Sequence, residues 1–237
     1  MGYRICCAGV SAEHIPLHHP YTISLVNQIT QYKTYAHPVL TSTSSSGHKS
    51  PILDTQKTLV ALWIGINDIN DSADYASPAF YNTLLTTLFT SLEALHDLGF
   101  RNYLLLNLTP LYRTPANQLL APQQQTPNKT QVETFNTLVA SHSALFERSK
   151  LGSNILVYDA HALLNRVLDS LVDYGIANTT DVCPGPKQAD IGTEYERYGC
   201  PTPVETYFWY DSGHIGERVH GVLVRGLERV LRRWKGR

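Results

Sequence analysis

A continuous apolar run, Thr58 to Ile66, constrains the fold of this 237-residue chain more than any other stretch. It lacks the polar–apolar alternation of a half-exposed strand and has the pattern of a strand buried on both faces. Similar strands are predicted at Tyr103–Leu108 and Ile155–Tyr158. Helical patterns alternate with these strands, which predicts an α/β protein: a three-layer α/β/α domain built on a parallel sheet.

The predicted helices have recognisable ends. One begins with Ser77 as its cap and Pro78 in its first turn, and Gly99 ends it. Further helices are predicted at Thr22–Tyr35, Val132–Phe146, Leu163–Tyr174 and Glu217–Trp234. We find no internal repeat and no interior linker long enough to divide the chain, so one domain over residues 1–237 is expected.

The composition argues against two classes of partner. Charged residues make up only 16% of the chain, and 19 Lys and Arg nearly balance 20 Asp and Glu, whereas a nucleic-acid binder would be strongly basic. The sequence has no apolar stretch of the roughly 20 residues that span a bilayer. We therefore expect neither nucleic acid nor a membrane as a partner. A monomer that acts on a small substrate is a separate expectation.

The candidate functional residues follow predicted strands, where active sites of parallel sheets lie. The spacing of Asp211 and His214 lets a tight loop fold the acid back onto the imidazole, as in the orienting half of a nucleophilic triad. Asn67 could donate a hydrogen bond to an oxyanion, and Gly9 could let a backbone N–H approach it. Each motif alone is also compatible with a simple capping loop or turn.

Together these motifs resemble SGNH (GDSL-like) hydrolases, and specifically the fungal carbohydrate acetylesterases of family 16. The resemblance rests on Ala8-Gly9-Val10-Ser11, Pro16-Leu17-His18-His19, Trp63-Ile64-Gly65-Ile66-Asn67-Asp68-Ile69, and Phe208-Trp209-Tyr210-Asp211-Ser212-Gly213-His214. It implies the flavodoxin-like SGNH hydrolase fold, with Gly9 and Asn67 as oxyanion donors, His214 as general base and Asp211 as its orienting acid. The implied activity is removal of acetyl groups from sugars or short xylo-oligosaccharides, without a metal or cofactor.

One departure from the family pattern concerns the nucleophile. The family's Gly-Asp-Ser block should precede Gly9, but none of the eight residues before Gly9 resembles it. Ser11, Ser44–Ser46 and Ser212 do not lie where the family places the nucleophile. We therefore expect that the serine and the first, central strand, between Tyr3–Cys7 and Thr58–Ile66, are absent. A misplaced start codon is the favoured explanation, and the chain alone is expected to be inactive.

Other features are typical of a secreted protein. Glycosylation sequons begin at Asn70, Asn107, Asn128 and Asn178. Cys183 and Cys200 bracket a Gly- and Pro-rich loop that would gain stability from a covalent link. The N-terminus does not have the apolar region of a signal peptide. The expectation is a full-length parent that is extracellular.

Two alternative interpretations stay open. A non-catalytic carbohydrate-binding protein would keep the crevice and lose the chemistry. Alternatively, His14, His18 and His19 could ligate a metal, but they lack an accompanying Cys or carboxylate pattern, so loop histidines are favoured. Cys6 and Cys7 are interpreted as residues of a buried strand rather than as reactive thiols.

Overall fold

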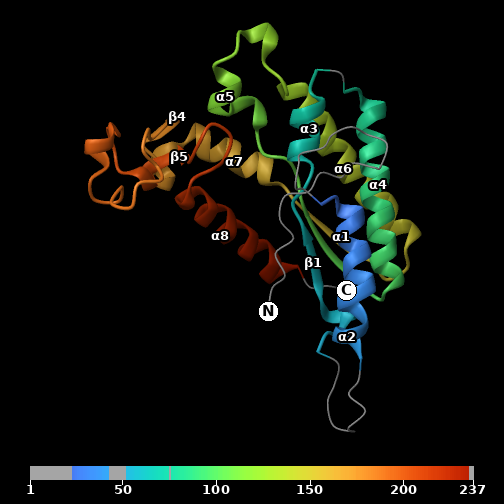
Figure 1. Ribbon diagram of the computed structural model, residues 1–237. Helices are drawn as coiled ribbons and strands as arrows, with labels where there is room; N and C mark the ends of the chain where they lie inside the picture. The colour runs from blue at the N-terminus through green and yellow to red at the C-terminus, as the bar shows by residue number, and fades with distance from the viewer. Residues whose placement is uncertain (1–22, 43–51, 75, 235–237) are drawn as a thin grey trace. The chain divides into compact units, whose positions relative to one another are not determined.

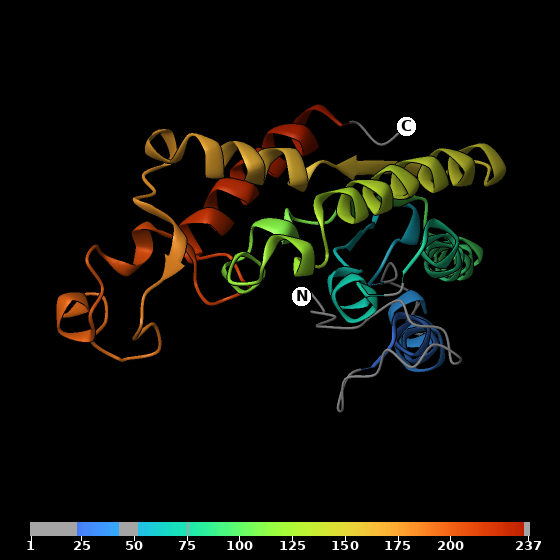
Figure 2. The same cartoon turned by 90° about the horizontal axis from the view of Figure 1, so that it is seen from above.

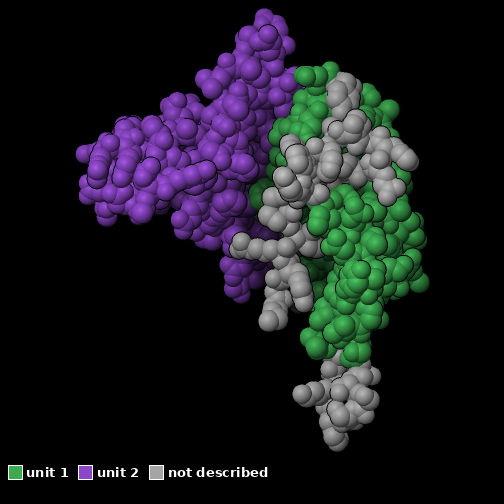
Figure 3. All heavy atoms as spheres, viewed as in Figure 1, with its two compact units in different colours: residues 1–108, 133–158, 236–237 green, residues 109–132, 159–235 purple. Residues whose placement is uncertain are grey.

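The computed structural model describes residues 23–42, 52–74 and 76–234. The chain divides into two compact units (Figure 3). Unit 1 comprises Met1–Leu108, Glu133–Tyr158 and the last two residues, and unit 2 comprises Thr109–Val132 and Asp159–Lys235. Both units are therefore built from segments that are not contiguous in the sequence. The expectation of one domain over residues 1–237 stays a prediction.

Unit 1 contains a parallel sheet in the order β1-β2-β3. The strands are β1 (Leu59–Leu62), β2 (Asn102–Leu106) and β3 (Asn154–Tyr158). Leu59 pairs with Asn102, and Asn102 pairs with Asn154, so the three strands start in register. Parallel strands connected through helices confirm the predicted α/β class.

The first strand is shorter and less buried than its sequence predicts. Tyr103, Leu104 and Leu105 in β2 are buried, as predicted, but Ala61 in β1 is exposed. The prediction of burial on both faces is therefore wrong for β1, because among the described residues β1 pairs only with β2. Tyr3–Cys7 lies outside the described residues, so the absence of a strand beside β1 stays a prediction.

Gly65 explains why the apolar run does not continue as a strand to Ile66. Its φ is +109°, a backbone conformation that favours glycine, and it precedes helix α3 (Ile66–Ser72). A Cβ atom at this position would lie 3.0 Å from Phe135 Cζ. The chain therefore turns abruptly from β1 into α3.

The helices of unit 1 follow their sequence signals closely. Helix α4 (Pro78–Asp97) begins after Ser77, whose side chain accepts a hydrogen bond from the Phe80 N–H, and the predicted leucine stripe is buried. Helix α1 (Leu25–Gln31) continues through a π-helical turn at Tyr32–Ala36 into α2 (His37–Thr41), beyond the predicted end. Helix α1 packs against α4 (Figures 1 and 2).

Helix α6 and the short helix η2 complete the elements that flank the sheet. Helix α6 (Lys129–Ser149) begins three residues before its predicted start at Val132, and most of it lies in unit 1. The short 3₁₀ helix η2 (Thr55–Lys57) precedes β1, and the Asp54 side chain caps it by accepting a hydrogen bond from the Gln56 N–H. The chain therefore enters β1 from a short capped turn.

Unit 2 contains more helix than the sequence predicts. It includes three short helices that the sequence did not predict: η3 (Leu111–Arg113), α5 (Pro115–Gln118) and η4 (Pro122–Gln124). Pro115 and Pro122 occupy the first positions of two of them, where a missing N–H costs nothing. Each of these helices is too short to leave a periodic apolar pattern in the sequence.

Helices α7 (Ala160–Asp169) and α8 (Glu217–Arg233) pack against each other in unit 2 (Figure 2). The predicted helix Leu163–Tyr174 ends as a 3₁₀ helix, η5 (Leu171–Tyr174), and Gly175 closes it with a φ of +67°. Strand β5 (Tyr207–Trp209) pairs in parallel with β4 (Asn178–Val182), a strand that was not predicted.

The loop between β4 and β5 is linked covalently. A disulfide joins Cys183 and Cys200, and both are buried with Tyr207 in one apolar cluster. Two 3₁₀ helices, η6 (Tyr195–Tyr198) and η7 (Val204–Thr206), complete this segment. The disulfide therefore fixes the segment that leads into β5 and the candidate site.

Candidate active site

The loop that follows β5 is closed at its base by backbone hydrogen bonds. The Tyr210 N–H donates to the His214 carbonyl oxygen at 2.8 Å, and the Gly216 N–H donates to the Phe208 carbonyl oxygen at 2.7 Å. An antiparallel bridge pairs Trp209 with Ile215 between them. These contacts hold the ends of a tight turn whose tip is Asp211 to His214.

Asp211 and His214 are in direct contact within this turn. His214 Nδ1 lies 2.8 Å from Asp211 Oδ1 and 3.0 Å from Oδ2. Asp211 Oδ1 also accepts hydrogen bonds from the Gly213 N–H at 3.0 Å and the His214 N–H at 2.8 Å. Because an ionised carboxylate only accepts, the Nδ1 atom carries the proton and donates it.

Hydrogen bonding keeps Asp211 in its ionised form. Partial burial alone would raise the pKa of Asp211, but the Gly213 N–H and then the side chain and N–H of His214 outweigh it and lower the pKa below its ordinary value. Burial lowers the pKa of His220 on α8, and the positive charge of His214 lowers it further. A carboxylate that stays charged can orient an imidazole and stabilise its protonated form.

The other ring nitrogen of His214 faces away from Asp211. The His214 side chain is 81% exposed, and Nε2 has no hydrogen-bond partner among residues 23–42, 52–74 and 76–234. A neutral imidazole with its proton on Nδ1 offers Nε2 as a base to a hydroxyl group. His214 Nε2 can therefore accept a proton from a nucleophile.

Asn67 lies in unit 1, in the first turn of α3 and directly after the Gly65 turn. It is half-buried, and its side chain makes no hydrogen bond to another described residue. Its amide N–H groups can serve as donors. Asp68, the next residue, is buried, and its carbonyl oxygen accepts a hydrogen bond from the Ser72 hydroxyl.

The carboxyl end of β2 in unit 1 is tied to neighbouring elements by residues that sequence reasoning missed. Trp63 Nε1 donates to the Asn107 carbonyl oxygen at 3.2 Å. The Asn136 side chain on α6 accepts from the Leu108 N–H at 2.8 Å and donates to the Leu108 carbonyl oxygen at 3.2 Å. A lone Asn inside a helix gives no sequence signal for this role.

The structure brings together two of the four predicted site residues. Asp211 and His214 contact each other in unit 2, whereas Asn67 belongs to unit 1. Gly9 lies outside the described residues, as do Ser11 and Ser44–Ser46. Ser212 is exposed at the tip of the turn, and its carbonyl oxygen accepts a hydrogen bond from the Ala116 N–H at 3.0 Å. The catalytic roles of these residues stay predictions.

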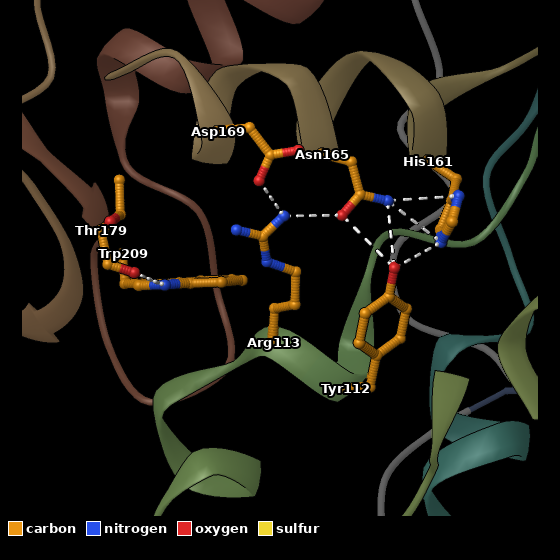
Figure 4. Close-up of polar contacts among 7 residues, drawn as sticks. All are labelled: Tyr112, Arg113, His161, Asn165, Asp169, Thr179 and Trp209. Carbon is orange, nitrogen blue, oxygen red and sulfur yellow. Dashed lines mark hydrogen bonds and ion pairs between the residues drawn. The ribbon is translucent and has the colours of Figure 1, made fainter. Parts of the chain in front are cut away.

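A polar cluster in unit 2 was also missed. Tyr112 and Arg113 on η3 contact His161, Asn165 and Asp169 on α7 (Figure 4). These partners are 49 to 56 residues apart in the sequence. Only the folded chain brings them together.

Neither metal binding nor membrane insertion is indicated in the described part of the chain. Within it, no three His, Cys, Asp or Glu side chains are grouped so that they could hold a metal ion. No helix there is long and apolar enough to cross a bilayer. His14, His18 and His19 lie outside the described residues.

Comparison with known proteins places this arrangement in a family. An acetylesterase of Thermothelomyces thermophilus is 27% identical over 234 residues, which cover 97% of this chain and 67% of the relative. An acetylesterase of Hypocrea jecorina is 27% identical over 199 residues, which cover 73% of this chain and 57% of the relative. A GDSL esterase/lipase of Arabidopsis thaliana is 21% identical over 227 residues, covering 89% of this chain and 62% of the relative.

The chain thus spans between about half and two thirds of the length of these curated relatives. The family model described as GDSL-like Lipase/Acylhydrolase matches residues 9–215, which include Asn67, Asp211 and His214. The match agrees with the predicted SGNH hydrolase fold. The chain therefore belongs to the GDSL-like lipase/acylhydrolase family.

Proposed function

We propose that this chain carries the acid–base part of a serine-type ester hydrolase that removes acetyl groups from acetylated carbohydrates. The observation that carries the proposal is the contact between His214 Nδ1 and Asp211 at 2.8 Å, at the end of a family match that covers most of the chain. In this role His214 Nε2 accepts the proton of a serine hydroxyl, and Asp211 stabilises the imidazolium that forms.

Asn67 has the role of an oxyanion donor in this proposal. As the carbonyl carbon of an ester is attacked, negative charge develops on its oxygen, and a fixed amide N–H lowers the energy of that state. Two observations support the assignment: the Asn67 side chain makes no hydrogen bond to another described residue, and Asn67 lies directly after the Gly65 turn. Gly9 is proposed as a second donor on its sequence motif alone.

The nucleophile is the part that the chain's own sequence does not supply in the family's form. None of its serines stands in a Gly-Asp-Ser context. We propose that the chain alone has at most weak ester hydrolase activity, because oxyanion donors without the nucleophile leave only a small part of the rate enhancement. The substrate class is supported by the names of two relatives, both of which are acetylesterases.

The test measures hydrolysis of p-nitrophenyl acetate and of acetylated xylo-oligosaccharides by this chain and by a version extended upstream in its gene. We expect the extended protein to turn over both substrates, and its His214→Ala variant to lose roughly 10³-fold or more in kcat. His220→Gln is the matched control, because it changes a histidine on α8, outside the turn that holds Asp211 and His214. Rapid, His214-dependent turnover by the short chain would contradict its inactivity.

The same experiment addresses a non-catalytic carbohydrate-binding role. The absence of a Gly-Asp-Ser sequence favours that role for the chain as it stands. Saturable binding of acetylated xylo-oligosaccharides by both proteins, with no ester turnover by either, would replace the hydrolase proposal by the binding one. An extended reading frame without a Gly-Asp-Ser block would also count against catalysis.

We further propose that the parent protein is secreted and acts as a monomer on a small sugar substrate. The disulfide between Cys183 and Cys200 supports secretion, because such bonds persist mainly in oxidising compartments. The exposed sequon residues Asn70 and Asn128 are also compatible with it.

A further inference from the structure

The polar cluster between η3 and α7 lies a few residues before Ala116, whose N–H is hydrogen-bonded to the turn that holds Asp211 and His214. Arg113 Nη1 donates to Asp169 Oδ1 at 2.7 Å and to Asn165 Oδ1 at 3.0 Å. The Tyr112 hydroxyl lies 3.3 Å from His161 Nε2 and exchanges hydrogen bonds with the Asn165 amide. Figure 4 shows Tyr112 and Arg113 both extending from η3 toward these side chains of α7.

The contacts of Arg113 connect η3 to α7. The Arg113 side chain is 30% exposed, so its ion pair with Asp169 is less screened by water than a fully exposed pair. Hydrogen bonds from a guanidinium to a carboxylate are stronger than bonds between neutral groups. Asn165 shares the same donor nitrogen and is itself held by Tyr112, so the cluster acts as one network.

The chain runs directly from Arg113 to the candidate site. Thr114 ends η3 and caps α5: its hydroxyl donates to the Leu111 carbonyl oxygen and accepts from the Asn117 N–H. Two residues after Thr114, the Ala116 N–H donates to the Ser212 carbonyl oxygen at 3.0 Å. The position of η3 on α7 therefore determines the position of the Ala116 N–H.

The bond from Ala116 is distinctive among the hydrogen bonds of the turn. The other bonds of residues 210–214 to described residues are internal to the turn. The bond to the Ser212 carbonyl oxygen is the one that reaches it from a different element. Because Ser212 follows Asp211 directly, movement at Ser212 changes the angle at which Asp211 meets His214.

We propose that Arg113 is a positioning residue for the Asp211–His214 pair, acting through η3, α5 and the Ala116–Ser212 hydrogen bond. The proposal rests on the proposed function, in which His214 is the general base. Loss of the Arg113 contacts loosens η3, weakens the bond to Ser212 and lowers the fraction of time that His214 Nδ1 donates to Asp211. His214 then presents the wrong tautomer more often.

The test compares Arg113→Met and Arg113→Lys with wild type by NMR. Two quantities are measured: amide hydrogen exchange at Ala116, and the Nδ1-protonated fraction of neutral His214 from its ring nitrogen shifts. We expect Arg113→Met to speed exchange at Ala116 by about tenfold or more, from the loss of charge-assisted bonds. Arg113→Lys should restore part of the protection, because its ammonium can still reach one acceptor.

Arg232→Met is the matched control, because it removes an Arg that pairs with a carboxylate, Glu228, within α8. It should leave both quantities as in wild type. If Arg113→Met does not fold, Asp169→Asn provides a milder change at a side chain that is 63% exposed. Unchanged Ala116 exchange and an unchanged His214 tautomer in the variants that fold would overturn the proposal.

The kinetic arm separates this proposal from the proposed function. In the upstream-extended protein we expect Arg113→Met to lower kcat by about tenfold and leave KM unchanged, because Arg113 positions the base and does not bind substrate. Suppose that neither the short chain nor the extended protein hydrolyses esters, but Ala116 exchange and the His214 tautomer change in Arg113→Met. The positioning role then stands and the hydrolase function fails. A changed KM with unchanged kcat would assign Arg113 to substrate binding instead.

Discussion

At the scale of single residues, Asp211 links the chemistry of the site to the stability of the fold. Its pKa is lowered in the folded protein, because hydrogen bonds from Gly213 and His214 outweigh the effect of its partial burial. A carboxyl group with a lowered folded-state pKa stabilises the fold above its unfolded pKa of about 3.9. This stabilisation is lost as the pH falls through the folded pKa.

We therefore expect Asp211→Asn to be less stable than wild type near neutral pH and to match it in acid. The measurement is urea unfolding of both proteins at a series of pH values from about 7 down to about 3. The stability difference should be full above about pH 4 and shrink as Asp211 becomes protonated. A difference that is constant with pH would show that the Asp211 charge does not stabilise the turn.

Residue-scale predictability depends on sequence distance. Asp211 and His214 could be paired from the sequence because residues three apart can be brought together by a single tight turn. The contact between Arg113 and Asp169 could not be foreseen, because 56 residues and several elements lie between them. Ion pairs of that kind follow from topology and carry no local pattern.

At the scale of elements, the disulfide is the strongest single restraint on the segment before β5. The bond closes a loop between residues 17 apart in the sequence and lies in a buried apolar cluster with Tyr207. Constraining a loop of this size in the unfolded chain stabilises the folded state by about 3 kcal/mol. Tyr207 begins β5, so the restraint ends three residues before Tyr210, where the turn of Asp211 to His214 begins.

We expect reduction of this disulfide to lower the free energy of unfolding by about 3 kcal/mol. Urea unfolding with and without dithiothreitol measures the change. Cys200→Ser should match the reduced protein, and dithiothreitol should leave its unfolding curve in place. Equal stability of oxidised and reduced wild type would show that the buried contacts of Cys183 and Tyr207 hold the loop without the bond.

Helices and strands with several agreeing sequence signals were predictable. A strand that exists because it pairs with another strand was not. Helix α4 could be placed because Ser77, Pro78 and the leucine stripe all indicate the same helix. Strand β4 reads Asn-Thr-Thr-Asp-Val and is a strand because it pairs with β5. Strand β1 was predicted too long: it ends at Leu62, and the positive φ of Gly65 then turns the chain into α3.

At the scale of the whole molecule, the fold class and the family were predictable, whereas the division into two compact units was not. Alternating buried strands and helices indicated the α/β class, and four short motifs indicated the family. The division falls at Leu108, Val132 and Tyr158, none of which lies in a linker of biased composition. Such a division depends on contacts between distant segments, which a pattern along one sequence does not encode.

The secreted parent that we propose should carry N-glycans selectively. Asn107, to which the glycan would be attached, is 8% exposed, so a glycan there is incompatible with the folded unit. Asn128 is exposed, and its Oδ1 accepts from the Gln131 N–H at 3.0 Å, whereas a glycan would occupy Nδ2. The helix cap and a glycan at Asn128 can therefore coexist, and Asn70 is exposed on α3.

We expect glycans at Asn70 and Asn128 and none at Asn107 when the extended protein is exported through a yeast secretory pathway. Mass spectrometry of peptides treated with a deglycosylating amidase measures occupancy at each asparagine. Asn70→Gln and Asn128→Gln should each remove one glycan from the secreted protein, and Asn107→Gln should remove none. A glycan on Asn107 in folded, secreted protein would mean that the carboxyl end of β2 is not buried as described, and the packing around Leu108 would have to be revised.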